Sequence, residues 1–303
     1  MRRCAGATRR QRDCRATDYL GVLNILAARG IRTSGVPMDE EGMVVDALEE
    51  SIRAERPAFI YTIPTYHNPR GVCLSAQRRV QLLELAARYR IPIVEDDIYG
   101  RLGLEGPAQP ALKAHDYGGH VIYLSSVSKS LMPGLRMGYI VAAPDLIRRF
   151  AAQRQAIDIC APPITQRALA IFIEQGWLHS HIRRMLPRYR ERRDALISAM
   201  EQSFPCGVTW TRPQGGFACW VSLPGGISIT DLYVNAVGRG VAFVPGEMFG
   251  PAPDGRAHLR LCFSAEPPER ISDAVATLGM LLRERSYGQP GQAAVSGDYV
   301  PVI

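Results

Sequence analysis

Lysine is rare in this chain, and one of the two lysines stands in a loop rich in groups that can do chemistry. Among 36 Lys and Arg residues only Lys113 and Lys129 are lysines, which leaves 36 − 2 = 34 arginines. Lys129 lies in Ser126-Val-Ser128-Lys129-Ser-Leu-Met-Pro-Gly-Leu-Arg136. A desolvated lysine, unlike an arginine, can lose its proton and attack a carbonyl. The segment favours a nucleophilic amine beside an anion site, suited to a phosphate-bearing aldehyde; the alternative is an exposed lysine in a polar loop.

Composition and charge describe an ordinary globular protein. Apolar residues make up 47% of the chain and charged residues 21%. The net charge of +7 suits anionic small molecules as well as nucleic acid. Seven scattered cysteines without a Cys-x-x-Cys pair predict reduced thiols and a cytoplasmic protein. No apolar run approaches the ~20 residues that cross a bilayer, so no membrane partner is expected.

Hydrophobic periodicity predicts two domains in the order large, then small. The first is expected at residues 18–165, with strands at 57–63, 91–94, 120–124 and 137–142 and a helix at 75–89 that has Ser75 as N-cap. Strands separated by helices predict βαβ units and a mostly parallel sheet. The second, at 166–287, combines a helical connector (164–202) with a smaller α+β domain, with strands at 208–210, 216–221, 241–244 and 258–263 and a helix at 268–285. Residues 1–17 form an atypical Arg-rich start, and 288–303 a disordered tail.

Polar side chains follow three consecutive strands of the predicted large domain. Asn68 follows the first strand, Asp96, Asp97 and Tyr99 the second, and the lysine loop the third. Ligands of open α/β sheets bind beyond the carboxyl ends of the strands, so these groups are expected to line one site. Taken singly, each has another explanation: Asn68 precedes a proline and suits a turn, either aspartate could cap a helix, and Tyr99 could fill a core.

Six segments between Tyr19 and Arg285 resemble the class I/II aminotransferases, which are fold type I pyridoxal-phosphate (PLP) enzymes. The similarity is strongest to 2-aminoadipate and kynurenine aminotransferases and to the aminotransferase-like half of MocR-type regulators. It rests on six motifs in the family's order: Tyr66-His-Asn68-Pro-Arg-Gly, Glu95-Asp-Asp-x-Tyr99, the lysine loop, Arg212-Pro-Gln-Gly-Gly-Phe, Val244-Pro-Gly-x-x-Phe and Leu259-Arg-Leu-Cys-Phe-Ser.

The resemblance implies a role for each matching residue. Lys129 would form the internal aldimine with PLP, and Asp96 would hold the pyridine nitrogen protonated. Asn68 and Tyr99 would hydrogen-bond the phenolic oxygen of the ring, and Tyr19 would stack on it. The remaining matches are the phosphate ligands Ser126, Ser128 and Arg136. Arg260, with Asn68, would bind the substrate carboxylate.

The resemblance also implies an amino acid and a 2-oxo acid as substrates, and a homodimer that binds no nucleic acid. The fold class expected is α/β, a fold type I PLP-transferase with an incomplete large domain. Relatives have further large-domain residues before the position of Tyr19, including a loop that cradles the phosphate. Met1–Ala16 resembles a mis-started stretch joined to an aminotransferase from about Asp18, and a short paralogue is the alternative.

Two other functions stay open at this stage. The first is the effector-binding part of a MocR-type regulator, which would need a DNA-binding segment ahead of this chain. The second is an inactive, truncated pseudoenzyme, for which the missing phosphate loop is the argument. No metal site is predicted, because His179 and His181 are two residues apart on a predicted helix and do not face each other. Substrate identity and other PLP chemistries remain undecided by the sequence.

Overall fold

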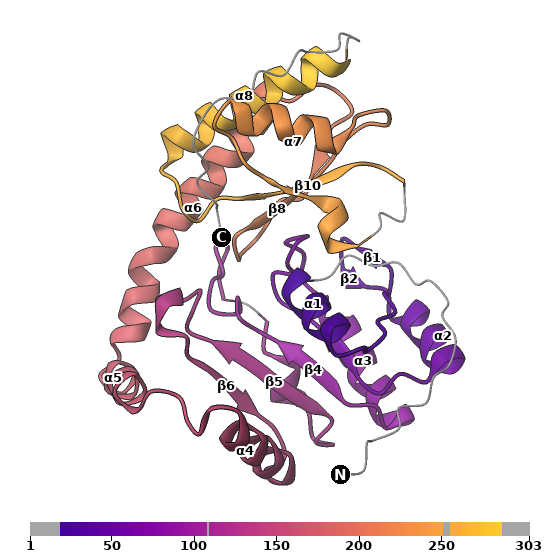
Figure 1. The fold of residues 1–303 in the computed structure, drawn as a ribbon, viewed down its shortest axis with the longest axis vertical. Coiled ribbons are helices and arrows are strands. Elements are labelled where there is room, and N and C mark those ends of the chain that lie inside the picture. Colours follow the sequence, from indigo (N-terminus) through magenta and orange to yellow (C-terminus); the bar gives the residue numbers. More distant parts are fainter. Residues whose placement is uncertain (1–18, 108, 251–254, 287–303) are drawn as a thin grey trace.

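Two β-sheets and the helices around them make up most of the described protein (Figure 1). The computed structural model describes residues 19–107, 109–250 and 255–286. The predicted start (1–17) and tail (288–303) lie outside the described residues. The described part opens with helix α1 (Leu20–Ala28) and a hairpin of β1 (Met38–Asp39) and β2 (Gly42–Met43).

The first sheet has the order β3-β4-β5-β6 and carries the three predicted strand ends. Its strands are β3 (Ile60–Thr62), β4 (Ile93–Asp96), β5 (Val121–Ser126) and β6 (Gly138–Val141). The first three are parallel and β6 is antiparallel, which confirms a mostly parallel sheet. Helices α2 (Val45–Glu55) and α3 (Ala76–Tyr89) pack with β3 and β4 around a buried aliphatic cluster. As predicted, Ser75 caps α3, because its hydroxyl accepts a hydrogen bond from the Arg78 amide.

The predicted connector helix is two helices. After α4 (Pro144–Asp158), α5 (Pro163–Glu174) ends before Gly176, and α6 (Trp177–Ser203) begins after it. Gly176 has a φ of 71°, a left-handed conformation that glycine adopts at no steric cost, and this turn separates the two helices. In Figure 1, α6 runs from α5, beside the first sheet, to the second sheet.

The second sheet is antiparallel throughout, with the order β7-β8-β10-β9. It consists of β7 (Thr209–Trp210), β8 (Ala218–Ser222), β9 (Val244–Pro245) and β10 (His258–Cys262). Helices α6, α7 (Ile229–Gly238) and α8 (Pro268–Ser286) pack on it around the larger hydrophobic core. The strand predicted at 241–244 is displaced, because β9 begins only at Val244.

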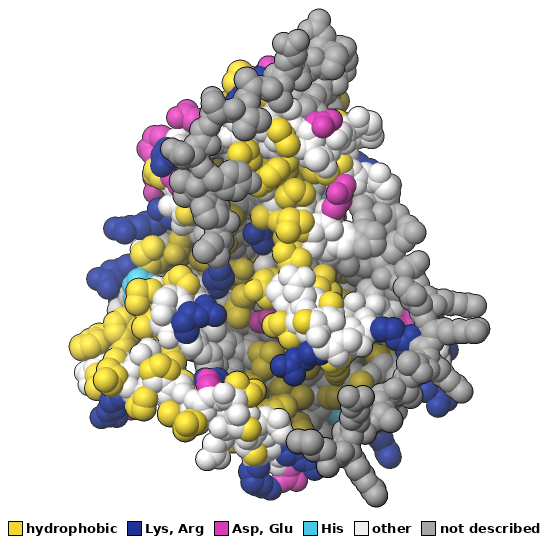
Figure 2. Space-filling model, viewed as in Figure 1, with side chains coloured by type: hydrophobic (Ala, Val, Ile, Leu, Met, Phe, Trp, Pro, Cys, Tyr) yellow, Lys and Arg dark blue, Asp and Glu magenta, His cyan; other side chains and the backbone are white. Residues whose placement is uncertain are grey.

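One edge of the first sheet is apolar and exposed. Every residue of β6, its outer strand, is exposed, and apolar side chains of α5 and the start of α6 are exposed nearby. We call this the β6–α5 face: Tyr139, Ile140, Val141, Ile164, Ile171, Ile173 and Trp177. Hydrophobic side chains gather over α5 at the lower left of Figure 2. Within the described residues, no helix is both long and apolar enough to span a membrane.

Candidate functional site

Two predicted site residues, 192 positions apart, meet between the two sheets. Nη1 of Arg260 in β10 donates a hydrogen bond of 2.9 Å to Oδ1 of Asn68, in the loop after β3. The Asn68 side chain is only 4% exposed, so this charge-assisted contact lies in a largely dehydrated place. Residues that sequence analysis assigned to one site are therefore brought together by the fold.

The loop after β3 is held in shape by its own backbone. The His67 amide donates to the Val72 carbonyl at 2.8 Å, on either side of the cis Asn68–Pro69 peptide. Gly71 has a φ of 71°, and a Cβ there would lie 2.6 Å from the Ala218 carbonyl oxygen of β8. The absence of a side chain at Gly71 therefore lets this loop contact the second sheet.

A pair of glycines also brings the two sheets together, around Tyr66. Gly215 and Gly216 belong to the Arg-Pro-Gln-Gly-Gly-Phe motif, and a Cβ on Gly215 would overlap the Tyr66 ring. Gly215 also pairs with Gly103 in an isolated antiparallel bridge. Tyr66 itself is 5% exposed and lies two residues before Asn68. This motif thus makes room for the loop that presents Asn68.

Arg260 is oriented by an aromatic ring as well as by Asn68. It pairs with Trp220 in β8 and Val244 in β9, at the centre of the second sheet. Its Cζ lies 5.2 Å from the centre of the Phe249 ring, within the range of a cation–π contact. Its Nε is buried and has no hydrogen-bond partner among the described residues. A carboxylate that reaches this guanidinium would find a buried, unused donor.

Asp96, the last residue of β4, presents one free carboxylate oxygen. Oδ2 accepts a hydrogen bond of 2.6 Å from the phenol of Tyr61 in β3. Oδ1 is buried without a hydrogen-bond partner in the described part of the chain. Burial raises the pKa of Asp96 above its ordinary value, and the hydrogen bond from Tyr61 opposes that rise. The free oxygen suits a donor such as a protonated ring nitrogen.

Tyr99 lies close enough to Asp96 and Arg260 for their charges to act on its phenol. Its phenol is 6% exposed, and burial raises its pKa strongly. The charges of Arg260 and Asp96 and the phenol of Tyr19 also act on this pKa, which puts all three within electrostatic range. Tyr19 directly precedes α1, and its ring lies over Gly21, where a Cβ would be 2.6 Å from a ring carbon.

The lysine loop leaves the end of the strand next to β4. Asp96 pairs with Leu124 of β5, and Ser126 is the final residue of that strand. The Ser128 amide donates to the Ser126 hydroxyl at 3.3 Å. Lys129 is exposed, and no hydrogen bond or ion pair joins its amine to another described residue. Its counterpart Lys113 is bound, since its amine lies 2.9 Å from both Asp116 Oδ2 and the Val121 carbonyl.

Arg136 closes the loop in a left-handed conformation. Its φ is 51°, and it follows the 3₁₀ turn η2 (Pro133–Leu135), directly before β6. The side chain is exposed and makes no ion pair with another described residue. Ser126, Ser128, Lys129 and Arg136 are therefore presented by one segment at the edge where Asp96 ends β4.

The other two carboxylates of the Glu-Asp-Asp motif are held by hydrogen bonds from other parts of the chain. Oδ2 of Asp97 accepts a hydrogen bond of 2.9 Å from the phenol of Tyr123 in β5. Glu95 is fully buried and accepts the amides of Leu112 and Lys113 at 2.6 and 2.9 Å, at the start of the 3₁₀ turn η1 (Leu112–His115). Burial raises the pKa of Glu95 to about 7.

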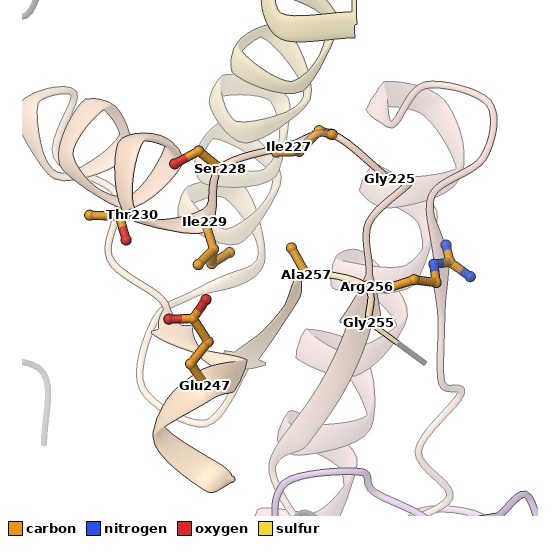
Figure 3. A pocket seen from close by; sticks show the side chains of 10 residues that line it. Gly225, Ile227, Ser228, Ile229, Thr230, Glu247, Gly255, Arg256 and Ala257 are labelled. Carbon is orange, nitrogen blue, oxygen red and sulfur yellow. The ribbon is translucent and has the colours of Figure 1, made fainter. Parts of the chain in front are cut away.

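Of two cavities in the described structure, one borders this cluster and the other lies apart from it. One of about 300 Å³ adjoins the lysine loop and is lined by Ser126, Ser130, Tyr139 and His179 among others. The other, of about 260 Å³, lies at the start of α7 and holds the charged groups Glu247 and Arg256 (Figure 3). The second contains none of the predicted site residues.

Sequence reasoning missed two side chains that contact the site. Tyr61 reaches Asp96 from a neighbouring strand, and only the strand register reveals that contact. Phe249 stood in the Val-Pro-Gly-x-x-Phe motif without a role, although it lies beneath Arg260. The sequence motifs identified Asp96 and Arg260 but not the side chains that contact them, because Tyr61 and Phe249 come from another strand and from a turn.

Comparisons with known proteins agree on one family. A family model described as aminotransferase class I and II matches residues 16–278. Aromatic-amino-acid aminotransferase 1 of Thermococcus litoralis is 41% identical over 274 residues, covering 89% of this chain and 66% of that protein. A crystal structure of an α-aminoadipate aminotransferase from Thermus thermophilus, complexed with N-(5′-phosphopyridoxyl)-L-leucine, superposes with a TM-score of 0.84. It is 34% identical and covers 90% of this chain and 70% of that one.

Regulators are also among the similar proteins. An uncharacterised HTH-type transcriptional regulator of Bacillus subtilis, YdfD, is 30% identical over 267 residues, which is 88% of this chain and 55% of the regulator. The chain thus spans about two thirds of the aminotransferases' length and about half of the regulator's.

Proposed function

We propose that this chain, which belongs to the class I and II aminotransferases, transfers an amino group from an amino acid to a 2-oxo acid. Pyridoxal phosphate is the cofactor of this family, and when bound it supplies an electron sink for the bonds at the substrate α-carbon. The observation that carries the proposal is the hydrogen bond between Asn68 and Arg260, which joins the residue proposed for the cofactor site to the residue proposed for the substrate carboxylate.

The groups on this chain suit that cofactor in type and in availability. Oδ1 of Asp96 is a buried acceptor without a partner among the described residues, as a protonated ring nitrogen would need. Asn68 and Tyr99 offer an amide and a phenol for the ring oxygen. Tyr19, within electrostatic range of Tyr99, would pack on the ring. The amine of Lys129 makes no ion pair within the described structure and is left for a carbonyl.

The phosphate and the substrate would be held by the remaining residues. The hydroxyls of Ser126 and Ser128 and the guanidinium of Arg136 would bind the phosphate. The buried Nε and the Nη1 of Arg260 would orient the substrate carboxylate. With the substrate so held, Nζ of Lys129 would take the proton from the substrate α-carbon and return it during transfer.

We also propose a homodimer in the cytoplasm. The β6–α5 face is apolar and exposed, and a surface of that kind on a sheet edge is typical of an interface. The described cysteines are free thiols, which suits a reducing compartment.

A titration of the purified protein with pyridoxal phosphate tests the function. A visible absorbance band is expected in wild type and in Lys113→Arg, but not in Lys129→Arg; both substitutions keep the charge and remove an amine. An amino acid donor should then bleach the band, and the 2-oxo acid product should appear in a coupled assay. A band that persists in Lys129→Arg would refute the assignment of Lys129.

A second function is favoured by the similarity to regulators: binding of the cofactor and an amino acid effector without turnover. The same titration separates the two. An amino acid that changes the band in the presence of a 2-oxo acid acceptor, without yielding product, would favour the effector-binding function over catalysis.

A further inference from the structure

A tyrosine from the neighbouring strand holds the carboxylate at the end of β4. The parallel register pairs Tyr61 of β3 with Val94 of β4. Because side chains alternate along a strand, Tyr61, Val94 and Asp96 share one face of the sheet. The Tyr61 phenol reaches along this face to Asp96, and its oxygen lies 2.6 Å from Oδ2. The contact is shorter than a typical hydrogen bond between neutral groups, as expected for a phenol that donates to a carboxylate.

The Tyr61 phenol favours the ionised form of Asp96. Burial and the neighbouring carboxylate of Asp97 both favour the neutral acid, and both raise the pKa of Asp96. The hydrogen bond from the Tyr61 phenol stabilises the ionised form and lowers the pKa, and the backbone amide of Ile98 acts in the same direction to a smaller extent. Tyr99 also faces Asp96, and its phenol has a pKa raised by burial and stays neutral near pH 7. No cation among the described residues forms an ion pair with Asp96.

We propose that Tyr61 is a positioning residue for the cofactor: it engages Oδ2 of Asp96, keeps that carboxylate ionised, and leaves Oδ1 to accept a hydrogen bond from the protonated ring nitrogen. The inference rests on the proposed function. A carboxylate with one oxygen fixed by a donor has one orientation available, so its second oxygen is presented in a defined direction. A rigid, ionised partner keeps the ring nitrogen protonated, and that protonation makes the cofactor an effective electron sink.

The chain supplies a matched control for the removal of this phenol. Tyr89 of α3 also donates to a carboxylate, Glu49 Oε1 of α2, at 2.7 Å, and none of the predicted site residues contacts that pair. Tyr61→Phe and Tyr89→Phe each delete one hydroxyl from a tyrosine–carboxylate pair. Any effect specific to Tyr61→Phe therefore belongs to its place beside Asp96.

The first measurement uses the full chain without cofactor. The carboxyl pKa of Asp96 is followed by ¹³C NMR, with Asp96→Asn to assign the signal. Tyr61→Phe is expected to raise this pKa by about one to two units, the usual worth of a hydrogen bond to a charged group. Tyr89→Phe should leave it unchanged. Should Tyr61→Phe fail to fold, 3-fluorotyrosine in place of Tyr61, a stronger donor, is expected to lower the pKa.

The second measurement uses the protein with pyridoxal phosphate. Tyr61→Phe is expected to weaken cofactor affinity about tenfold. It should also raise the pH midpoint of the visible band, because a less protonated ring nitrogen withdraws fewer electrons. In Asp96→Asn, the further change Tyr61→Phe should add little to either effect, since the two residues act as one unit.

Each outcome decides a separate point. An Asp96 pKa that does not rise in Tyr61→Phe overturns the inference. A raised pKa with unchanged affinity and midpoint also overturns it, because the hydrogen bond would then serve only the fold. If the wild type binds no cofactor, the proposed function fails, and the NMR measurement still decides whether Tyr61 keeps Asp96 ionised.

Discussion

Breaking the contact between Asn68 and Arg260 is expected to destabilise the packing of the first sheet against the second. The Nη1–Oδ1 distance is 2.9 Å and Asn68 is 4% exposed, so the bond is a charge-assisted one in a dry place. Such hydrogen bonds contribute about 1.5–3 kcal/mol. Because Arg260 is only half-buried, the lower end of that range applies, and Asn68→Ala should lower the free energy of unfolding by about 2 kcal/mol, including the donor left unpaired.

A double-mutant cycle isolates this contact. Asn68→Ala, Arg260→Leu and the double variant are unfolded in urea. Unfolding is followed by far-UV circular dichroism and by the fluorescence of Trp210 and Trp220 in the second sheet and of Trp177 at the start of α6. The coupling free energy should be about 1.5 kcal/mol. Arg239→Leu, which deletes an exposed ion pair, should cost less than about 0.5 kcal/mol. A coupling below about 0.5 kcal/mol would refute the reasoning.

Three further predictions concern the surroundings of the site. The folded-state pKa of Glu95, about 7, lies above its ordinary value of 4.5, so the folded state favours the protonated acid. The free energy of unfolding should therefore fall by about 3 kcal/mol between pH 4.5 and 8. Glu95→Gln should remove this fall, and urea denaturation at a series of pH values measures it. Phe249→Leu removes the ring 5.2 Å from Arg260 and should raise the KM for the amino acid about threefold to tenfold with little change in kcat; equal falls in kcat and kcat/KM would contradict a binding role. Gly215→Ala must displace the Tyr66 ring and should lower the unfolding free energy by about 1–3 kcal/mol; an unchanged urea midpoint would show that the ring moves freely.

Periodicity predicted the first sheet well because its strands are short, apolar and bounded by polar turns. The Ser75 cap was also predictable, since a side-chain cap is a local interaction. Where the prediction failed, backbone conformation decided. The stretch 164–202 has a continuous helical pattern, yet Gly176 turns the chain between two helices. The strand expected at 241–244 begins only at its last residue, because pairing with β10 selects Val244 and Pro245.

The candidate site residues could be selected from the sequence because each stands directly beyond a strand or in a motif. Their mutual contacts were not. Asn68 and Arg260 are 192 positions apart, and no local pattern states that they share a hydrogen bond. Tyr61 resembled any aromatic residue of a buried strand until the register placed it beside Asp96. The sequence states which chemical group each residue carries. Its hydrogen-bond partners depend on how strands that are distant in the sequence align.

The unequal states of the two lysines have a practical consequence. Lys113 is tied to Asp116 and to a backbone carbonyl, and Lys129 is exposed without an ion-pair partner among the described residues. Side-chain amines in this chain therefore differ sharply in accessibility to acylating reagents. Within the described structure, a fluorophore or isotope tag added at low stoichiometry should label Lys129 in preference to Lys113. Lys129 is the residue proposed to bind the cofactor, so its labelling rate reports whether the cofactor is bound.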